Sequence, residues 1–101
     1  MTTARETLDR AVTEREWQDQ VLDYAKLRSW LCYHTYDSRR SAPGFLDLVL
    51  VRERIVFAEL KTERGKVTLM QRAWLDAIVA AGGEAYCWRP SDIDDVMRGL
   101  A

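Results

Sequence analysis

The 101-residue chain lacks several features that define other classes of protein. Its two cysteines, Cys32 and Cys87, fit no metal-ligand spacing, and both stand in apolar strand-like segments that predict small buried side chains. No apolar run approaches the roughly 20 residues that a membrane-spanning helix needs. The first residues have no apolar signal core, so we expect a cytoplasmic protein without membrane association.

The chain also lacks an excess of charge of either sign, since the formal net charge is −1. That value argues against a large, uniformly basic DNA-coating surface, although it permits a local basic patch. The composition, 48% apolar and 31% charged residues, is that of an ordinary globular protein, and the length allows one compact domain. We expect a flexible N-terminus over residues 1–12, at most a frayed helical turn, and a single domain over residues 13–101.

Two acidic residues interrupt the most apolar part of the chain. Between Gly44 and Lys61 the sequence is GFLDLVLVRERIVFAELK, with Asp47 and Glu59 where a buried strand should carry no charge. A charge in an apolar sheet costs several kcal/mol unless it is paired or binds a metal. Together with Lys61, the two acids predict a metal-dependent active site.

The spacing of the two acids predicts their geometry. If residues 45–51 and 55–61 form an antiparallel hairpin around the turn 52–54, Asp47 lies directly opposite Glu59, with Cβ atoms about 4.5–5.5 Å apart. A divalent cation would relieve the repulsion between the two carboxylates. Lys61 falls on the same face. The opposite face of the hairpin is wholly apolar, and the face with the two acids is otherwise apolar. We therefore expect helices on both sides of the sheet.

The remaining segments predict an α/β fold of order αβββαβα. Thr13 opens a helix to about residue 28 through a capping-box pattern with Glu16, and Thr68 and Gln71 open a second helix in the same way. The residues expected to face inward on that second helix are Leu69, Ala73, Trp74, Ala77, Ile78 and Ala81. We expect strands over 30–36 and 84–89, a loop over 37–44, a final helix over 92–98, and a parallel crossover from 55 to 89.

With the carboxylates placed, the chain resembles the PD-(D/E)XK nuclease superfamily and, more narrowly, the VRR-NUC family of virus-type replication-repair nucleases. The segments that carry this resemblance are Gly44-Phe45-Leu46-Asp47, Phe57-Ala58-Glu59-Leu60-Lys61, Gly65-Lys66-Val67-Thr68 and Gln71-Arg72-Ala73-Trp74-Leu75. One departure is Leu46, where the family usually has proline. The resemblance implies a restriction-endonuclease-like domain, with a mixed four-stranded sheet flanked by helices.

The resemblance also implies roles for particular residues. Asp47, Glu59 and the backbone carbonyl of Leu60 would bind Mg²⁺, for which Mn²⁺ could substitute, and no organic cofactor is implied. Lys61 would orient or help deprotonate the attacking water, and Gln71 would hold Lys61, a water or a phosphate. Glu16 would add a carboxylate from the first helix, with Glu14 as its competitor. Capping explains Glu16 and Gln71 equally well without any catalytic role.

The implied activity is a metal-dependent DNA endonuclease, selective for branched DNA such as flaps or junctions, that acts in replication, repair or recombination as a homodimer. The expected phosphate contacts are Arg39, Arg40, Lys66, Arg72 and His34. Against this, arginines 39 and 40 could form an ordinary solvated loop and His34 a plain strand residue. Two other functions stay open: a non-catalytic DNA-binding or assembly module, and an interaction domain in which Asp47 pairs with Lys61.

Overall fold

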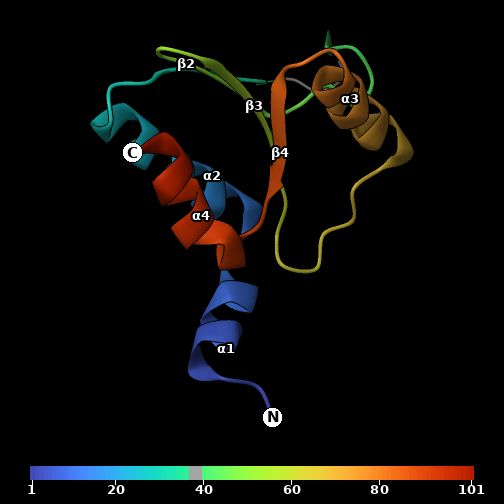
Figure 1. The fold of residues 1–101 in the computed structure, drawn as a ribbon. Helices are drawn as coiled ribbons and strands as arrows, with labels where there is room; N and C mark the ends of the chain where they lie inside the picture. The colour runs from blue at the N-terminus through green and yellow to red at the C-terminus, as the bar shows by residue number, and fades with distance from the viewer. Residues whose placement is uncertain (37–39) are drawn as a thin grey trace.

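The computed structural model describes residues 1–36 and 40–101 and forms an α/β domain around one four-stranded sheet. The strands are β1 (Leu31–His34), β2 (Leu48–Val51), β3 (Ile55–Leu60) and β4 (Glu84–Trp88), in that spatial order. The helices are α1 (Ala4–Ala11), α2 (Glu14–Leu27), α3 (Leu69–Ala80) and α4 (Ile93–Leu100), with a 3₁₀ turn, η2 (Pro90–Asp92), before α4 (Figure 1).

The sheet is mixed, as predicted. β1 pairs with β2 and β2 with β3 in antiparallel fashion, whereas β3 and β4 are parallel, so the chain crosses over through α3. The hairpin has the predicted register, because Leu48 faces Ala58 and Val51 faces Ile55. It is shorter than the segments 45–51 and 55–61 that were expected. Asp47 therefore lies immediately before β2, where the same register places it opposite Glu59.

Threonine side chains start three of the helices. Thr3, Thr13 and Thr68 each accept a hydrogen bond from the backbone N–H three residues ahead. At Thr13 and Thr68 the reciprocal bond from the capping-box partner is also present, which confirms both predicted helix starts. These caps fix where α2 and α3 begin relative to the strand ends.

One face of the sheet forms the main core against α2 and α4. Leu48, Leu50, Val56, Ala58 and Leu60 all point to this face and are fully buried. Two tryptophans form indole N–H hydrogen bonds that link α2 to β4 and the segment before β1 to α4. Trp17 of α2 donates to the carbonyl of Trp88 at 3.0 Å, and Trp30 donates to that of Leu100 at 2.9 Å.

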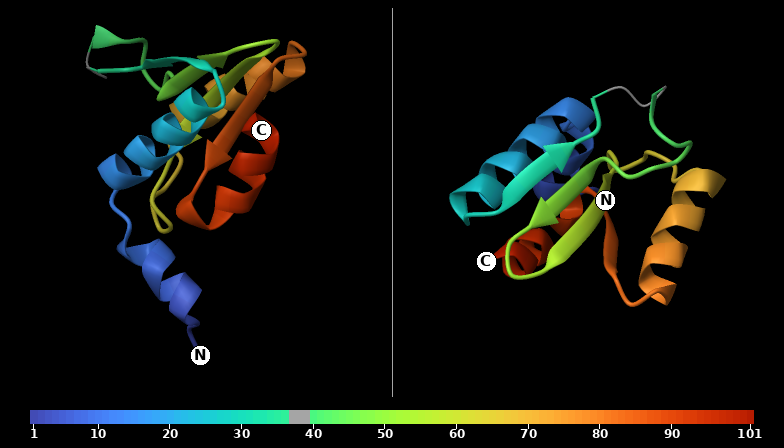
Figure 2. Two further views of the ribbon diagram at one scale, coloured as in Figure 1. Left: turned by 90° about the vertical axis from the view of Figure 1, so that its left-hand side faces the viewer. Right: turned by 90° about the horizontal axis from the view of Figure 1, so that it is seen from above.

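Helices lie on both sides of the sheet, as predicted, but the other face is covered only in part. Among the described residues α3 packs beside β4 and leaves β1 and β2 open in front, as the view from above shows (Figure 2, right). Only Leu75 of α3 is fully buried, with Trp74 and Ile78 half-buried. The predicted inward face was therefore wrong in part: Leu69, Ala73, Ala77 and Ala81 are all exposed.

The N-terminus also differs from expectation. Instead of an irregular start over residues 1–12, α1 forms two turns of helix that extend away from the sheet (Figure 1). The Thr3 cap and an Arg5–Asp9 ion pair of 3.6 Å stabilise it. No residue of α1 is buried. In the described ranges, we find no helix with the length and apolar character needed to cross a membrane.

Candidate active site

Asp47 is held at the start of β2 by the backbone of the neighbouring strand. Its carboxylate Oδ2 accepts the N–H of Leu60 at 2.8 Å, and its own carbonyl accepts the N–H of Thr35 at 2.9 Å. The side chain thus continues the pairing between β2 and β3 past the last regular ladder bond. These two bonds fix the Asp47 carboxylate beside Glu59. Its partner is the Leu60 N–H rather than Lys61, which disfavours the interaction-domain hypothesis.

Glu59 is the buried acid of the site. Its side chain is 1% exposed, and one carboxylate oxygen, Oε2, has no hydrogen-bond partner among the described residues. Burial raises the pKa of Glu59 to about 9, and the adjacent Asp47 carboxyl adds to the rise through a hydrogen bond and through charge repulsion. The nearby Lys61 ammonium opposes the rise. In the absence of a cation, Glu59 therefore keeps its proton at neutral pH.

Lys61 follows at the end of β3, where an arginine-braced loop begins. The N–H of Lys61 donates to the carbonyl of Trp88 at 3.0 Å. Beyond it, the guanidinium of Arg89 donates to the carbonyls of Thr62 and Gly65 at 2.7 and 2.6 Å. These bonds satisfy loop carbonyls that would otherwise lack partners and hold the loop after Lys61 in place.

The N-terminus of α3 closes one side of the site by packing on the segment before Asp47. Gly44 has a φ of +78°, and a Cβ there would lie 2.5 Å from the backbone carbonyl carbon of Met70. The Phe45 ring packs edge-on against Trp74 at 5.1 Å, and the Trp74 indole donates to the carbonyl of Pro43 at 3.1 Å. Close approach at a glycine and an aromatic contact thus align α3 with Asp47.

Gln71 is half-buried in the first turn of α3 and serves the capping box. Its Oε1 accepts the N–H of Thr68 at 2.9 Å, which confirms the structural explanation for this residue. Because the carbonyl oxygen makes that bond, the amide NH₂ remains as a donor group. Capping and a polar contact toward the site are therefore compatible at Gln71.

The carboxylates of α2 divide between two roles. Glu16 accepts the N–H of Thr13 at 2.9 Å within the capping box, and this bond lowers the pKa of Glu16. Glu14 is the α2 acid whose charge reaches the site, since it adds to the raised pKa of Glu59 after burial and Asp47. This charge effect, the smallest of those on Glu59, favours Glu14 over Glu16 as the helix carboxylate.

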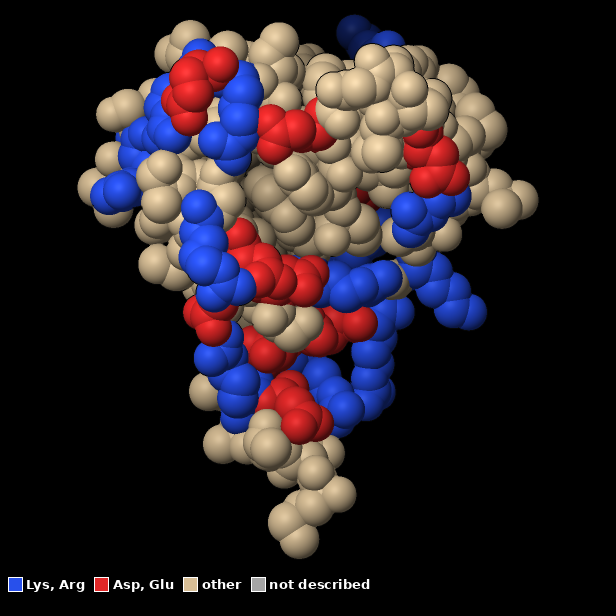
Figure 3. All heavy atoms as spheres, viewed as in Figure 1, with Lys and Arg blue, Asp and Glu red and all other residues tan. Residues whose placement is uncertain are grey.

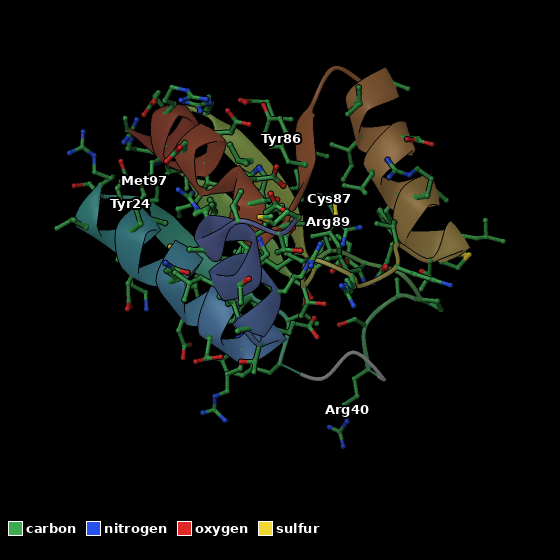
Figure 4. All side chains as sticks on the ribbon, turned by 90° about the horizontal axis from the view of Figure 1, so that it is seen from below. Tyr24, Arg40, Tyr86, Cys87, Arg89 and Met97 are labelled. Atoms are coloured by element: carbon green, nitrogen blue, oxygen red, sulfur yellow. The ribbon has the colours of Figure 1, made fainter. Side chains whose placement is uncertain are left out.

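Strand register brings a cysteine to the site that the sequence predicted only as a small buried side chain. Cys87 stands beside Glu59 across the parallel β3–β4 pair. Burial raises the pKa of the Cys87 thiol, while the charges of Arg89, Arg72 and Lys61 oppose the rise. Figure 4 shows Cys87 and Arg89 close together at β4. Spacing alone could not place Cys87 here, because α3 separates the two strands in sequence.

The expected phosphate contacts do not all gather at the site. His34 pairs with Leu48, so its side chain points to the core face, away from Asp47, and its ring lies tilted against that of Tyr36, with centroids 3.8 Å apart. Arg39 lies outside the described residues. Arg40 points outward from the loop that precedes Gly44 (Figure 4), and Lys66 is exposed. Arg72 is exposed, near Asp76 at 3.7 Å.

Acidic and basic side chains are interspersed over the face seen in Figure 3. A cavity of about 570 Å³ lies along β4 and α4, with Cys87 and Arg72 in its wall, rather than over Asp47. Asp47 and Glu59 lie at one end of the two central strands, and neither lines this cavity.

The donor set can be tested against a divalent metal. Within residues 1–36 and 40–101, no three His, Cys, Asp or Glu side chains stand close enough to form a metal cluster. The pair formed by Asp47 and Glu59 nevertheless fits a hard cation, because Oε2 of Glu59 is buried and unpartnered beside a second carboxylate. A two-carboxylate site completed by backbone carbonyl and water is typical of Mg²⁺.

Comparisons with known proteins add no relative: no family model, curated protein or solved structure matches this chain.

Proposed function

We propose that this protein is a divalent-metal-dependent DNA endonuclease that hydrolyses phosphodiester bonds. The observation that carries the proposal is the buried Glu59, whose Oε2 has no partner, beside Asp47 held by the Leu60 N–H. A buried carboxyl oxygen without a partner costs stability, and the bond from the Leu60 N–H accounts for Asp47 but not for Glu59. A cation-binding role explains both acids together.

In this proposal Asp47, Glu59 and the carbonyl of Leu60 hold Mg²⁺ or Mn²⁺, with Glu14 as the outer carboxylate. When bound, the metal would activate water and stabilise charge on the phosphate. Lys61, at the end of β3, orients the attacking water and offsets negative charge on the phosphate. The amide NH₂ of Gln71 donates to a phosphate oxygen or to that water. Lys66 and Arg72 provide phosphate contacts.

The test is cleavage of labelled flap, splayed, junction and linear DNAs with Mg²⁺ or Mn²⁺. We expect metal-dependent cutting by the native chain, preferentially of branched DNA. Lys61→Ala should reduce it by about 10²–10³-fold, the usual cost of losing one charge-stabilising donor. The matched control is Lys26→Ala, which removes an exposed lysine near the end of α2 and should cut normally.

A parallel thermal measurement separates the alternatives. Metal that binds the folded state should raise the melting temperature of the native chain but not that of Asp47→Asn. Stabilisation by Mn²⁺ without cutting of any DNA would favour the second candidate, a non-catalytic DNA-binding module. That candidate has one observation in its favour, the lack of a three-side-chain metal cluster in the described residues. If the native chain shows no cutting and no stabilisation by metal, the metal site itself is rejected.

A further inference from the structure

The sheet face that carries the carboxylates continues into two apolar rows. Register and side-chain alternation place Tyr33, Val49 and Phe57 side by side in the row next to Asp47 and Glu59. The following row contains Leu31, Val51 and Ile55. Because α3 packs beside β4, no helix of residues 1–36 and 40–101 crosses in front of β1 and β2 (Figure 2, right). These six residues are called the apolar rows below.

The apolar rows are open to solvent on the β1 side. Tyr33 is 57% exposed and Leu31 is 74% exposed, and Ile55 at the hairpin end is 52% exposed. Phe57, closer to α3, is half-buried and packs edge-on to Phe45 at 6.4 Å. A contiguous apolar patch of this kind usually marks a binding surface.

Tyr33 lies close to the carboxylates. It is one strand away from Asp47 and two residues along the strand, which corresponds to a separation of about 8 Å from strand spacing and rise. A nucleotide whose phosphate lies at Asp47 and Glu59 could place its neighbouring base over the Tyr33 ring. Aromatic rings on an open sheet face bind unpaired bases by stacking, whereas bases within a duplex are stacked on each other and out of reach.

We propose that Tyr33 is a stacking platform for an unpaired base beside the cleaved phosphate, so the substrate class is DNA that is single-stranded at the cleavage point. This rests on the proposed nuclease function. The low net charge supports it, since a chain of charge −1 gains less from the phosphate backbone and relies more on contacts to bases.

The same observations favour DNA over a second copy of the chain as the occupant. A protein partner seated on the apolar rows would also reach over the adjacent row of Asp47 and Glu59. It would then close the carboxylates to substrate. A DNA strand that lies along both rows uses the two surfaces at once.

The test is binding of a dye-labelled oligothymidine and of its duplex with oligoadenosine, followed by fluorescence anisotropy in EDTA. The native chain should bind the single strand more tightly. Tyr33→Leu keeps an apolar side chain and should weaken single-strand binding about 5- to 100-fold, the range for one stacked base. Tyr33→Phe retains the ring and should bind like the native chain. Tyr86→Leu is the matched control, because Tyr86 is a 41% exposed tyrosine on β4.

Several outcomes would overturn the proposal: unchanged binding by Tyr33→Leu with an unaltered melting curve, tighter binding of the duplex, or equal losses for Tyr33→Leu and Tyr86→Leu. Sedimentation supplies another: a native dimer that becomes monomeric in Tyr33→Leu would assign the apolar rows to a second copy. Because binding is measured without metal, the two proposals fail separately. Stacking at Tyr33 without any cutting rejects the nuclease alone, whereas cutting that is unaffected by Tyr33→Leu rejects the platform alone.

Discussion

At the scale of single residues, Glu59 makes the stability of the metal-free protein depend on pH. Burial and the adjacent Asp47 raise the pKa of Glu59 from 4.5 to about 9. Between those values the folded chain keeps a proton that the unfolded chain has lost. The free energy of unfolding should therefore fall as pH rises from about 4.5 to 9, because the folded state binds more protons throughout that window.

Glu59→Gln removes this dependence and keeps a side chain of similar shape that can donate to Asp47. In EDTA at pH 8 we expect the variant to be more stable than the native chain because an amide needs no proton, by at most about 1.4 kcal/mol for each pH unit above 4.5. The gap should close toward pH 4.5, and Mn²⁺ should stabilise only the native chain. Urea unfolding at several pH values measures this. A native stability that rises from pH 5 to 8 would contradict it.

Gln71 has a capping role that can be separated from a catalytic one. Gln71→Glu keeps an oxygen that can accept the Thr68 N–H, so the melting temperature should stay unchanged. It loses the amide donor and adds a negative charge, so cutting should fall at least about tenfold. Thr68→Ala is the converse control: it should cost about 1 kcal/mol of stability and leave cutting at saturating metal nearly intact. If Gln71→Glu cuts normally, the residue is a cap only.

The same logic distinguishes the two acids of α2. Glu16→Gln keeps an acceptor for the Thr13 N–H, whereas Glu14→Gln removes the charge that reaches Glu59. We expect Glu14→Gln to raise the metal concentration needed for half-maximal cutting by several-fold, about the effect of one outer carboxylate. Glu16→Gln should leave it unchanged. If Glu16→Gln raised that metal concentration and Glu14→Gln did not, Glu16 would be the outer carboxylate of the metal site.

At the scale of elements, Gly44 controls how α3 meets the site. Gly44→Ala would force a Cβ to 2.5 Å from Met70 at a φ of +78°, so α3 or the segment before Asp47 must shift. We expect a loss of more than about 2 kcal/mol and a clear loss of cutting. Gly82→Ala is a matched control, with a φ of +90° but no atom within 4 Å of the added Cβ. It should cost only about 1 kcal/mol. Equal losses in thermal melts would show that strain alone matters.

The starts of α2 and α3 and the hairpin register followed from local signals, but burial on α3 did not. The capping boxes at Thr13 and Thr68 and the hairpin register are determined within a few residues, so the sequence predicts them well. The inward face of α3 depends on which strands it covers, and that choice is made by Gly44, Phe45 and Trp74. Periodicity placed Leu69 inward, although it is 89% exposed. The contact that decides the face joins segments far apart in sequence.

At the scale of the whole molecule, the residues of the site also fall into two groups, those placed by local sequence and those placed by tertiary packing. Asp47, Glu59 and Lys61 belong to one hairpin, so their shared face could be derived from spacing. Cys87 and Arg89 arrive from β4 after a long crossover, so their alignment with Glu59 depends on tertiary packing. His34 was misjudged because one residue of strand parity decides which face a side chain occupies.

The overall charge makes a final prediction about DNA binding. With a net charge of −1 and interspersed charges, binding should involve few phosphates, about three to four, and the logarithm of the affinity should fall with that of salt at a slope near −2 to −3 for a single strand. Lys66→Ala and Arg72→Ala should each make the slope shallower by about 0.7, since each removes one contact. Arg98→Ala, an exposed change on α4, should not. Anisotropy titrations from 50 to about 300 mM salt measure the slope. An unchanged slope in both site variants would mean that the DNA approaches another face, because a surface that releases no counterions at Lys66 or Arg72 does not hold the backbone there.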